Sequence, residues 1–440
     1  MKILLVGSGG REHALAWKIR QSPLCDQLYI APGNPGMRPL GHLLDIAPTD
    51  LIGIVHAAKD LGVGLVVVGP EDPLALGLVD ALKDAGIPAF GPTKAGAALE
   101  ADKAFSKKMM RDAAIPTAEG RAFTTLRSAI GFIETRTEPL VVKAAGLARG
   151  KGVIVCRDPV EALDVVRDIM EKKIFGDAGK TVVIEERLEG AEISLLAFVD
   201  GANAYLMEAA QDHKRIGEGD TGPNTGGMGA FSPAPLLTDT LIEKVQREII
   251  VPLMDSLRRN EIDYRGVLYT GLMLTAGGPK VLEFNARFGD PECQPLMMRL
   301  QSDLVEVMLA TVEGRLDEIT LRWDPRPALC VVLASEGYGW KPDAQVTRGV
   351  EITGLDDAAT IDGVQIFHAG TALADGKLVT SGGRVLGVTA IGDTLDDARQ
   401  RAQDAIAKIH FAGMQWRKDI GMKSGRAGKA EPPQRGNTIS

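Results

Sequence analysis

The segment from Lys280 to Glu292, KVLEFNARFGDPE, places acidic, amide and guanidinium side chains within a few residues of one another. Its apolar start predicts a buried strand, on which successive side chains point to opposite faces. On that pattern Val281, Glu283 and Asn285 share one face. A carboxylate and an amide oxygen side by side are ligands that Mg²⁺ accepts when nucleotide phosphates and water complete its shell. The plainer alternative is a polar strand face in solvent, and this short motif alone does not exclude it.

A second stretch with suitable chemistry is the glycine-rich segment 139–158, PLVVKAAGLARGKGVIVCRD. It predicts two strands, 140–143 and 152–156, around a loop whose glycine and basic residues are Gly146, Arg149, Gly150, Lys151 and Gly152. Glycines let backbone amides approach a polyphosphate, and Lys143 at the strand end can reach the same oxygens. The order of residues is not that of a P-loop, so the segment predicts a different phosphate clamp. A flexible glycine hairpin with solubilising cations is the alternative.

Two further regions suit nucleotide binding. A helix is expected from about Asp102, with Lys103 in its first turn, where a cation opposes the helix dipole. A bound phosphate would explain that lysine, although a solvated side chain is the simpler interpretation. After the apolar strand 181–185, the connector Glu185, Glu186, Arg187 and Leu188 can offer backbone groups to an adenine edge, and Glu192 can accept from ribose hydroxyls. Glu192 equally suits an outward position on an alternating strand.

The segment Gln211 to Pro235, QDHKRIGEGDTGPNTGGMGAFSPAP, shows little periodicity and many glycines and prolines. Irregular segments of this length in a compact domain are usually functional or disordered. Asp212 and Lys214 are the candidates for ordering a substrate. His213 has no partner for a nucleophile pair or metal cluster nearby in the sequence, so we expect a structural role for it.

The chain opens with an apolar strand, the glycine turn Gly7, Gly9 and Gly10, and a helix beginning at Arg11. Amides at such a helix start suit an anion, and Arg11 adds a positive fork. A dinucleotide site is the alternative, but position 12 is Glu and the second strand ends in APGN without an acidic ribose ligand. The sequence therefore favours phosphate or ribose phosphate.

Asn34 and Glu71 lie in loops that follow predicted strands of the same region. Alternating strands and helices imply a parallel sheet whose ligand binds at the carboxyl ends of its strands. These two residues are therefore substrate-binding candidates, with a turn residue or a helix cap as the alternative for each. The remaining expected helices are 50–61, 74–85, 238–259, 294–312 and 395–409, and the remaining strands are 65–68, 87–90, 268–275, 329–334, 364–369 and 384–390.

Charge, cysteine spacing and hydropathy argue against several classes of protein. The formal net charge is -8 over 440 residues and no Lys/Arg cluster stands out, which argues against a nucleic-acid partner. The four cysteines are scattered without metal-ligand spacing, and no apolar run is long enough to span a membrane. We expect a reduced, cytoplasmic protein that binds small molecules, away from membranes and nucleic acid.

Taken together, the motifs GSGGREHA, APGNPG, GPEDPL, KAAGLARGKGV, QDHKRIGEGDTGPNTGGMGAFSP, LEFNARFGDPE and FHAGT resemble those of the phosphoribosylamine-glycine ligases, an ATP-grasp family. The resemblance implies a mixed α/β and α+β multidomain fold. Its expected parts are an N-terminal parallel-sheet domain (1–101), an ATP-grasp domain (102–323) with a flap subdomain at about 118–190, a C-terminal α+β domain (324–422) and a disordered tail (423–440). Ala145 and Arg149 depart from the usual flap motif, and Ala286 stands where Cys is common.

The resemblance also implies a reaction, in which ATP drives the joining of glycine to 5-phosphoribosylamine through glycyl phosphate, in a monomer or weak homo-oligomer. Glu283 and Asn285 would bind Mg²⁺, or Mn²⁺. The ATP-binding residues would be Lys103, Lys143, Gly150, Lys151, Gly152, Glu185, Glu186, Leu188 and Glu192. Arg287, Lys214, Asp212 and Asp290 would act on glycine, and Gly10, Arg11, Asn34 and Glu71 would hold the ribose phosphate. An ATP-grasp ligase or carboxylase for another substrate and a non-catalytic nucleotide-binding protein are the alternatives.

Overall fold

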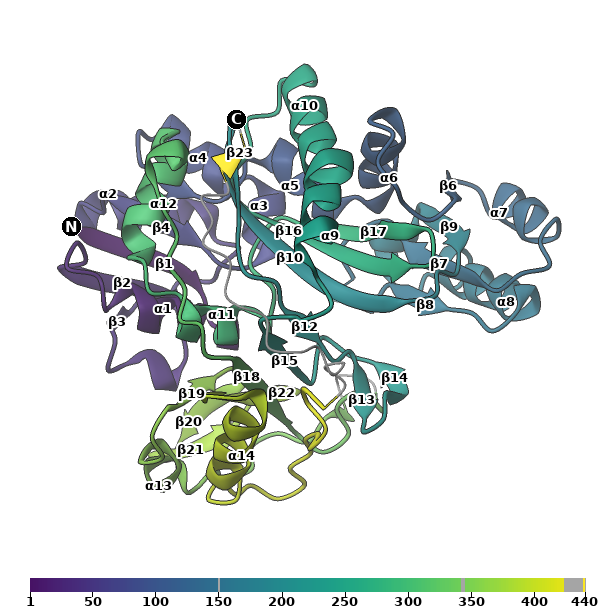
Figure 1. Ribbon diagram of the computed structural model, residues 1–440. Coiled ribbons are helices and arrows are strands. Elements are labelled where there is room, and N and C mark those ends of the chain that lie inside the picture. Colours follow the sequence, from purple (N-terminus) through teal and green to yellow (C-terminus); the bar gives the residue numbers. More distant parts are fainter. Residues whose placement is uncertain (149–150, 342–344, 423–437, 440) are drawn as a thin grey trace.

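The computed structural model describes residues 1–148, 151–341, 345–422 and 438–439 (Figure 1). The N-terminal part is a five-stranded sheet of order β3-β2-β1-β4-β5, in which every pair is parallel. Its strands are β1 (Lys2–Gly7), β2 (Gln27–Pro32), β3 (His42–Leu43), β4 (Leu65–Val68) and β5 (Ala89–Phe90). Its helices are α1 (Gly10–Ile19), α2 (Leu51–Leu61), α3 (Glu71–Leu76), α4 (Leu78–Asp84) and α5 (Lys94–Ala101). The alternating strands and helices correctly predicted this parallel sheet.

The prediction of one continuous helix over 74–85 is wrong. Two helices, α3 and α4, meet at Gly77, whose φ of 94° lies in the left-handed region. A helix cannot continue through that conformation, which glycine adopts readily. Helix α3 begins at Glu71, three residues after Val68, the last residue of β4.

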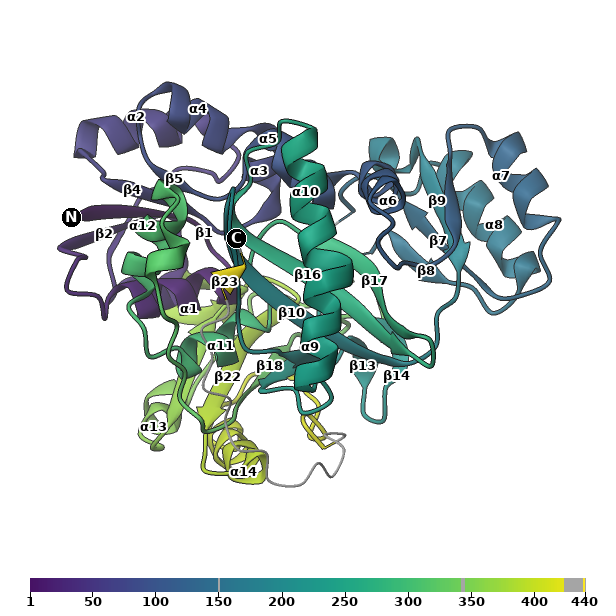
Figure 2. The same cartoon turned by 45° about the horizontal axis from the view of Figure 1, so that its top comes forward.

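The flap region is a separate four-stranded antiparallel sheet of order β6-β9-β7-β8 (Figure 2). Its strands are β6 (Gly120–Phe123), β7 (Leu140–Ala144), β8 (Val153–Val155) and β9 (Val182–Glu186), and its helices are α7 (Leu126–Ile133) and α8 (Pro159–Met170). One apolar cluster, which includes Ile133, Val142, Val166 and Ile184, joins the helices to the sheet. The two strands predicted around the glycine loop are therefore confirmed as β7 and β8.

The central sheet has the order β17-β16-β10-β11-β23. Its strands are β10 (Ala191–Asp200), β11 (Ala204–Leu206), β16 (Arg265–Thr275), β17 (Gly278–Asn285) and β23 (Thr438–Ile439). Helices α6 (Lys103–Asp112), α9 (Asp239–Val245) and α10 (Val251–Arg259) belong to this part, and a π-helical segment (Gln246–Ile250) joins α9 to α10. Of the tail beyond 422, only β23 falls within the described residues, so the predicted disorder of that tail stays a prediction.

The pairing of β16 with β17 contains a bulge that the strict alternation did not predict. Gly271 pairs with Glu283 and the next residue, Leu272, pairs with Val281, so Leu282 is the extra residue. Val281 is fully buried in the same apolar cluster as Phe284. The expectation that Val281 shares a face with Glu283 is therefore wrong, because the bulge reverses the alternation before Glu283.

The C-terminal part contains a five-stranded sheet of order β12-β15-β18-β22-β19 and the hairpin β20-β21 (Figure 1). These strands are β12 (Gln211–Asp212), β15 (Gly229–Ser232), β18 (Ala328–Ala334), β19 (Val364–His368), β20 (Thr371–Ala374), β21 (Lys377–Thr380) and β22 (Arg384–Ile391). The helices are α13 (Leu355–Ala359) and α14 (Leu395–Ile406).

Two predictions fail in this part of the chain. The segment 211–235 was predicted to be irregular, yet it forms β12 and β15 of this sheet and the hairpin of β13 (Arg215–Gly217) and β14 (Thr221–Asn224). These strands are too short to show periodicity; β15 pairs with β18, which lies far along the chain, and β12 pairs with β15. The helix predicted over 294–312 is two helices, α11 (Cys293–Arg299) and α12 (Leu304–Glu313), because Leu300 is extended and Asp303 caps α12.

Candidate active site

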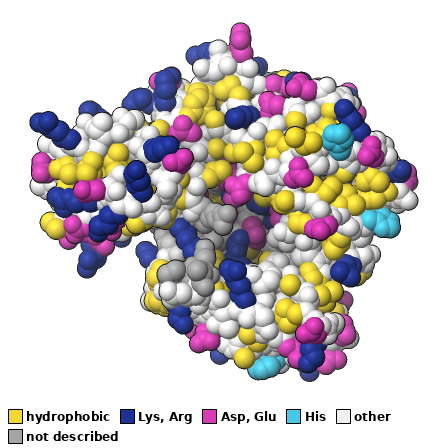
Figure 3. Space-filling model, turned by 180° about the vertical axis from the view of Figure 1, so that it is seen from behind, with side chains coloured by type: hydrophobic (Ala, Val, Ile, Leu, Met, Phe, Trp, Pro, Cys, Tyr) yellow, Lys and Arg dark blue, Asp and Glu magenta, His cyan; other side chains and the backbone are white. Residues whose placement is uncertain are grey.

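A cavity of about 960 Å³ lies where the N-terminal, flap, central and C-terminal parts meet. On the face shown in Figure 3 the molecule is hollowed, and Lys and Arg side chains gather around the hollow. We call the 960 Å³ space the central cavity. The predicted site residues that line it are Arg11, Glu71, Lys103, Lys143, Gly152, Glu185, Glu186, Leu188, Glu192, Asp212, Lys214, Glu283, Asn285, Arg287 and Asp290.

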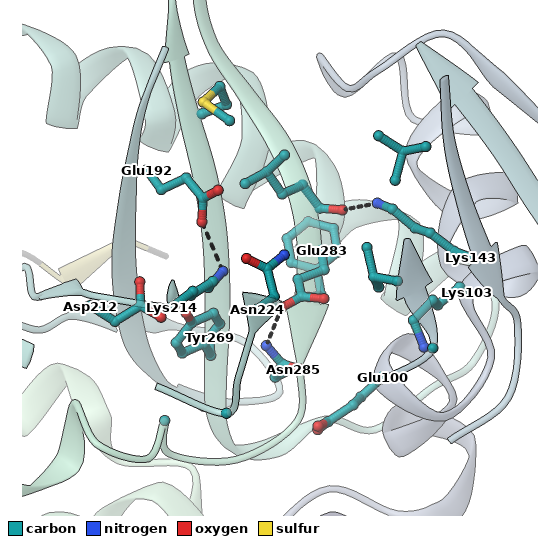
Figure 4. A pocket seen from close by; sticks show the side chains of 18 of the residues that line it. Glu100, Lys103, Lys143, Glu192, Asp212, Lys214, Asn224, Tyr269, Glu283 and Asn285 are labelled. Carbon is teal, nitrogen blue, oxygen red and sulfur yellow. Dashed lines mark hydrogen bonds and ion pairs between the residues drawn. The ribbon is translucent and has the colours of Figure 1, made fainter. Parts of the chain in front are cut away.

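Glu283 and Asn285 lie together on β17, beyond the bulge. The amide nitrogen of Asn285 lies 3.5 Å from Oε1 of Glu283. Burial favours a raised pKa for Glu283, but the ammonium groups of Lys214, Lys143 and Lys103 lower it, so the carboxylate is ionised. Figure 4 shows Lys103 and Lys143 on one side of this pair and Lys214 on the other.

This donor set fits a divalent ion that is shared with a nucleotide. No group of three or more His, Cys, Asp or Glu side chains placed to hold a metal occurs among the described residues. One carboxylate and one amide oxygen leave most of an octahedral shell to other oxygens, and Mg²⁺ commonly takes these from phosphates and water. Glu283 and Asn285 can therefore hold the ion only against such a ligand.

The amines of the site come from a helix start and a strand end. Nζ of Lys103 donates to the carbonyl of Gly146 at 3.3 Å, and Nζ of Lys143 donates to the carbonyl of Leu282 at 3.1 Å. Lys143 also forms an ion pair with Glu185. Nζ of Lys107 lies 2.8 Å from the other carboxylate oxygen of Glu185. Lys103, Lys107 and Lys143 thus lie on the flap side of the site and outnumber the carboxylates of Glu185 and Glu283, which leaves positive charge available for phosphates.

Lys107 was missed by the sequence analysis. It lies one helical turn after Lys103 in α6, and that spacing of four residues was the available signal. The three residues predicted in the flap loop differ in outcome. Gly150 lies outside the described residues, and Lys151 is exposed, whereas Gly152 lines the cavity.

Asp212 and Lys214 enter the cavity from β12 and the turn after it. Nζ of Lys214 forms an ion pair with Glu192 at 2.9 Å. Burial, assisted by the nearby negative charges of Glu292 and Glu192, raises the pKa of Asp212 to about 7 against the opposing effect of Lys214. Burial disfavours the charged form of Lys214, yet Asp212 and Glu192 raise its pKa well above the usual value. Lys214 is thus cationic, while Asp212 can change its protonation near neutral pH.

Arg287 joins the N-terminal part to the end of β17. Its Nη2 donates to Glu100 at 2.6 Å and its Nε donates to Glu71 at 3.1 Å. Nη2 of Arg11 lies 3.8 Å from the same Glu71 carboxylate. Burial favours a raised pKa for Glu71, but Arg287 and then Arg11 lower it to about 2. The four side chains form a connected charge network along one wall of the cavity, in which Glu100 was not predicted.

Asp290 lies at the side of the cavity that faces the C-terminal part. Arg384 forms an ion pair with its carboxylate at 2.9 Å, and Gln294 donates to it at 2.8 Å. Close by, the hydroxyls of Ser194 and Tyr269 both hydrogen-bond to Oε1 of Glu292, at 3.0 and 2.9 Å. Arg384, Tyr269 and Ser194 were not predicted, because each comes from a strand that carries no local motif.

Gly10 and Asn34 do not line the central cavity. Nδ2 of Asn34 donates to the carbonyls of Ser8 and His368 at 2.8 and 2.9 Å, and its Oδ1 accepts from the amide of Gly36. This is the helix-cap alternative raised from the sequence. At the turn before Gly10, the amide of Gly9 donates to the carboxylate of Glu12 at 2.7 Å. Direct substrate contacts for Gly10 and Asn34 stay predictions.

The combination of a parallel-sheet domain, a small antiparallel flap and a long central sheet around one charged cavity defines an ATP-grasp fold. The biotin carboxylase domain of Hydrogenobacter thermophilus 2-oxoglutarate carboxylase shares this fold. It is 17% identical, aligns with a TM-score of 0.71 and covers 94% of this chain and 91% of its own length.

The family is more specific than the fold. Models of the phosphoribosylglycinamide synthetase N domain, ATP-grasp (A) domain and C domain match residues 1–100, 101–293 and 328–423. A phosphoribosylamine–glycine ligase of Rhodopirellula baltica is 52% identical over 96% of this chain and 97% of that relative. The crystal structure of a phosphoribosylamine–glycine ligase from Thermotoga maritima is 34% identical, with a TM-score of 0.82 over 96% of this chain and all of that one. The chain belongs to the phosphoribosylamine–glycine ligase family.

Proposed function

We propose that this protein is an ATP-dependent ligase that joins glycine to 5-phosphoribosylamine and forms ADP, phosphate and glycinamide ribonucleotide. The observation that supports this most is the placement of Glu283 and Asn285 between the amines of Lys103 and Lys143 on one side and Lys214 on the other. A carboxylate substrate is a poor acylating agent until it is phosphorylated, and this arrangement suits transfer of a phosphoryl group to it. Family membership supports the choice of substrates.

In this proposal the flap side of the cavity holds the nucleotide. Lys103 and Lys143 neutralise its phosphates, and the connector after β9 accepts and donates hydrogen bonds at the adenine edge. Glu283 and Asn285 would hold Mg²⁺, or Mn²⁺, and the ion would supply positive charge to neutralise the phosphate oxygens. Gly152 lines the flap side of the same space, where backbone amides can approach the phosphates.

The opposite side of the cavity holds glycine and the sugar phosphate. Lys214, with Asp212 beside it, faces the carboxylate that receives the phosphoryl group, and Arg287 and Asp290 orient glycine. Attack of the phosphoribosylamine nitrogen on glycyl phosphate breaks the acyl–phosphate bond, forms the amide and releases phosphate. Arg11 and Glu71 bind the sugar phosphate in the N-terminal part, with Gly10 and Asn34 shaping the turns behind them.

The proposal needs no covalent enzyme intermediate, because ATP itself activates the glycine carboxylate as an acyl phosphate. Its small-molecule substrates also need no nucleic-acid or membrane partner, and no helix among the described residues combines the length and apolarity required to cross a bilayer. A cytoplasmic location and a monomeric or weakly associating state belong to the same proposal.

An omission assay tests this function. Purified protein is incubated with ATP, Mg²⁺, glycine and freshly generated phosphoribosylamine, and each component is left out in turn while ADP and glycinamide ribonucleotide are measured. We expect both products only in the complete mixture. ADP formation that proceeds equally with glycine replaced by another amino acid, or with bicarbonate in its place, would assign the site to a different ligase or carboxylase.

A further inference from the structure

The segment formed by residues 417–421, near the end of the C-terminal part, lies against the β13–β14 hairpin. We call this segment the C-terminal strap. Its residue Arg417 is among the largest fully buried side chains, with 1% of its surface exposed. The strap is separated from the hairpin by about two hundred residues of sequence, as in the contact between Arg417 and Arg215. An arginine buried this completely needs several partners, and the hairpin supplies them.

The guanidinium group of Arg417 bonds to the hairpin at two points. Nη1 donates to the backbone carbonyl of Arg215 at 3.0 Å and to Oδ1 of Asp220 at 2.9 Å. Its other nitrogens, Nε and Nη2, donate to the two carboxylate oxygens of Asp419 at 2.8 and 2.7 Å. The planar fork therefore connects β13 and the turn that follows it to the strap in one fixed geometry, which a lysine cannot reproduce.

The strap holds the tip of the same hairpin through two more bonds. The amide of Gly219 donates to Oδ2 of Asp419 at 2.8 Å, and the amide of Lys418 donates to Glu218 at 3.1 Å. Burial acts to raise the pKa of Asp419, but the hydrogen bonds from Arg417 and the Gly219 amide lower it to about 2. Asp419 is therefore ionised at neutral pH and accepts from both partners at once.

The residue that precedes Arg215 is Lys214, whose side chain enters the central cavity. The carbonyl of Lys214 accepts from the amide and the hydroxyl of Thr225, at 2.7 and 2.8 Å. Two consecutive carbonyls are thus held by hydrogen bonds. Thr225 holds the carbonyl of Lys214, and Arg417 holds the carbonyl of Arg215. This fixes the backbone from which Lys214 reaches Glu192, 2.9 Å away.

We propose that Arg417 is a positioning residue for Lys214, so that the C-terminal part sets the geometry of the phosphoryl-acceptor side of the cavity without touching a substrate. The proposal rests on the function proposed above for Lys214. It predicts that loosening the strap impairs turnover while nucleotide binding, which uses the flap side of the cavity, is retained. Small misplacements of groups that orient substrates cost large factors in rate.

The test compares three variants of the full chain with the wild type. Arg417→Met removes the fork, Arg417→Lys keeps only the charge, and Arg299→Met is the matched control. Arg299 is also buried, at 3% exposure, and it bonds to Ser232 rather than to the hairpin. The readouts are kcat in the complete reaction, the Kd for ADP with Mg²⁺, and hydrogen exchange of peptides that cover residues 213–225.

For Arg417→Met we expect kcat to fall by about 10-fold to 100-fold, with the Kd for ADP changed less than about 3-fold. Amides of 213–225 should exchange at least about 10-fold faster. In the wild type, local opening of the hairpin must break the strap contacts, and in this variant those contacts are already lost. The kcat and the exchange rates of Arg417→Lys should lie between those of Arg417→Met and those of the wild type. Arg299→Met should lose thermal stability yet keep kcat within about 3-fold.

Equal losses of kcat in the Arg417→Met and Arg299→Met variants, or unchanged exchange in 213–225, would overturn the positioning role. If Arg417→Met does not fold, Asp419→Asn removes the same anchor more gently and must show the same separation of kcat from ADP affinity. A wild-type protein without glycine-dependent turnover would instead refute the proposed function. The exchange measurement would then still decide whether the strap orders the hairpin.

Discussion

Lys143 and Glu185 form a buried ion pair inside the central cavity, and Lys107 lies 2.8 Å from the second carboxylate oxygen of the same Glu185. Burial favours a raised pKa for Glu185, yet Lys143 and then Lys107 lower it, so the carboxylate carries its charge. With two amines for one carboxylate, Lys143 can turn its ammonium group toward a phosphate while Lys107 still pairs Glu185. The ion pair therefore keeps Lys143 at the phosphate site, and little free energy is lost when its ammonium group turns from Glu185 to a phosphate.

Replacing Lys143 by Met should weaken ATP binding by about 10-fold to 100-fold, since a desolvated charge–phosphate contact is lost. The free energy of unfolding should change by less than about 2 kcal/mol, because Lys107 keeps Glu185 paired. Titration calorimetry and urea unfolding measure the two quantities. Lys280→Met is the matched control: it removes a lysine 2.9 Å from the neighbouring Glu186 and outside the cavity lining, and should leave ATP affinity within about 3-fold. Equal affinity losses in the two variants would contradict the assignment.

Asp212 should make the free energy of unfolding depend on pH. Its pKa is about 7 in the folded protein, above the usual value of 3.8, because burial disfavours the charged form. A raised carboxyl pKa adds stability that is complete below pH 3.8 and is lost as the pH rises through 7. Asp212→Asn should therefore gain about 1 to 2 kcal/mol of unfolding free energy relative to the wild type between pH 4 and 8. The gain is less than the full shift implies, because the carboxyl faces an open cavity.

The same variant tests whether the charge of Asp212 is used in turnover. If its ionised form orients Lys214, the wild-type kcat should rise with pH through about 7, and Asp212→Asn should lose that limb of the profile. Stability curves that run parallel for the two proteins from pH 4 to 8 would show that the carboxyl is not perturbed.

Arg287 should be needed for stability as well as for activity. Its loss leaves the carboxylates of Glu71 and Glu100 without their main partner, and Glu100 is 7% exposed. We expect Arg287→Met to lower the unfolding free energy by about 3 to 5 kcal/mol. Denaturant unfolding monitored by circular dichroism measures the change.

A double variant separates the unpaired charge from lost packing. Adding Glu100→Gln to Arg287→Met should restore at least about 1 kcal/mol, because it removes the buried carboxylate that Arg287 neutralised. Strictly additive losses would mean that the Arg287–Glu100 contact is not a coupled ion pair. Activity should stay low in both variants, since neither has the guanidinium group that lines the cavity.

Local sequence patterns predicted the cavity-lining residues of β17 better than those that long-range packing brings to the cavity. Glu283 and Asn285 share a face as expected, because the bulge at Leu282 precedes them and leaves their mutual alternation intact. Val281, on the other side of the bulge, was placed on the wrong face. A bulge depends on pairing with β16, so the local pattern of β17 does not reveal it.

Glu100, Tyr269 and Arg384 reach the cavity only through long-range packing. Arg384 pairs with Asp290 across 94 positions, and Arg287 pairs with Glu100 across 187. No spacing within a single helix or strand encodes such contacts. Strand β15 escaped prediction for the same reason, because its partner β18 begins at Ala328.

The most direct test of the metal site is the Mg²⁺ dependence of ADP affinity, measured by titration calorimetry on the wild type and on Glu283→Gln. Glu208→Gln, a half-buried glutamate 3.4 Å from Arg299 and outside the cavity lining, is the control. We expect Mg²⁺ to tighten ADP binding by at least about 10-fold in the wild type and the control but not in Glu283→Gln, with turnover falling at least about 100-fold in that variant alone. A Glu283→Gln protein whose ADP affinity still responds to Mg²⁺ as the wild type does would contradict the account.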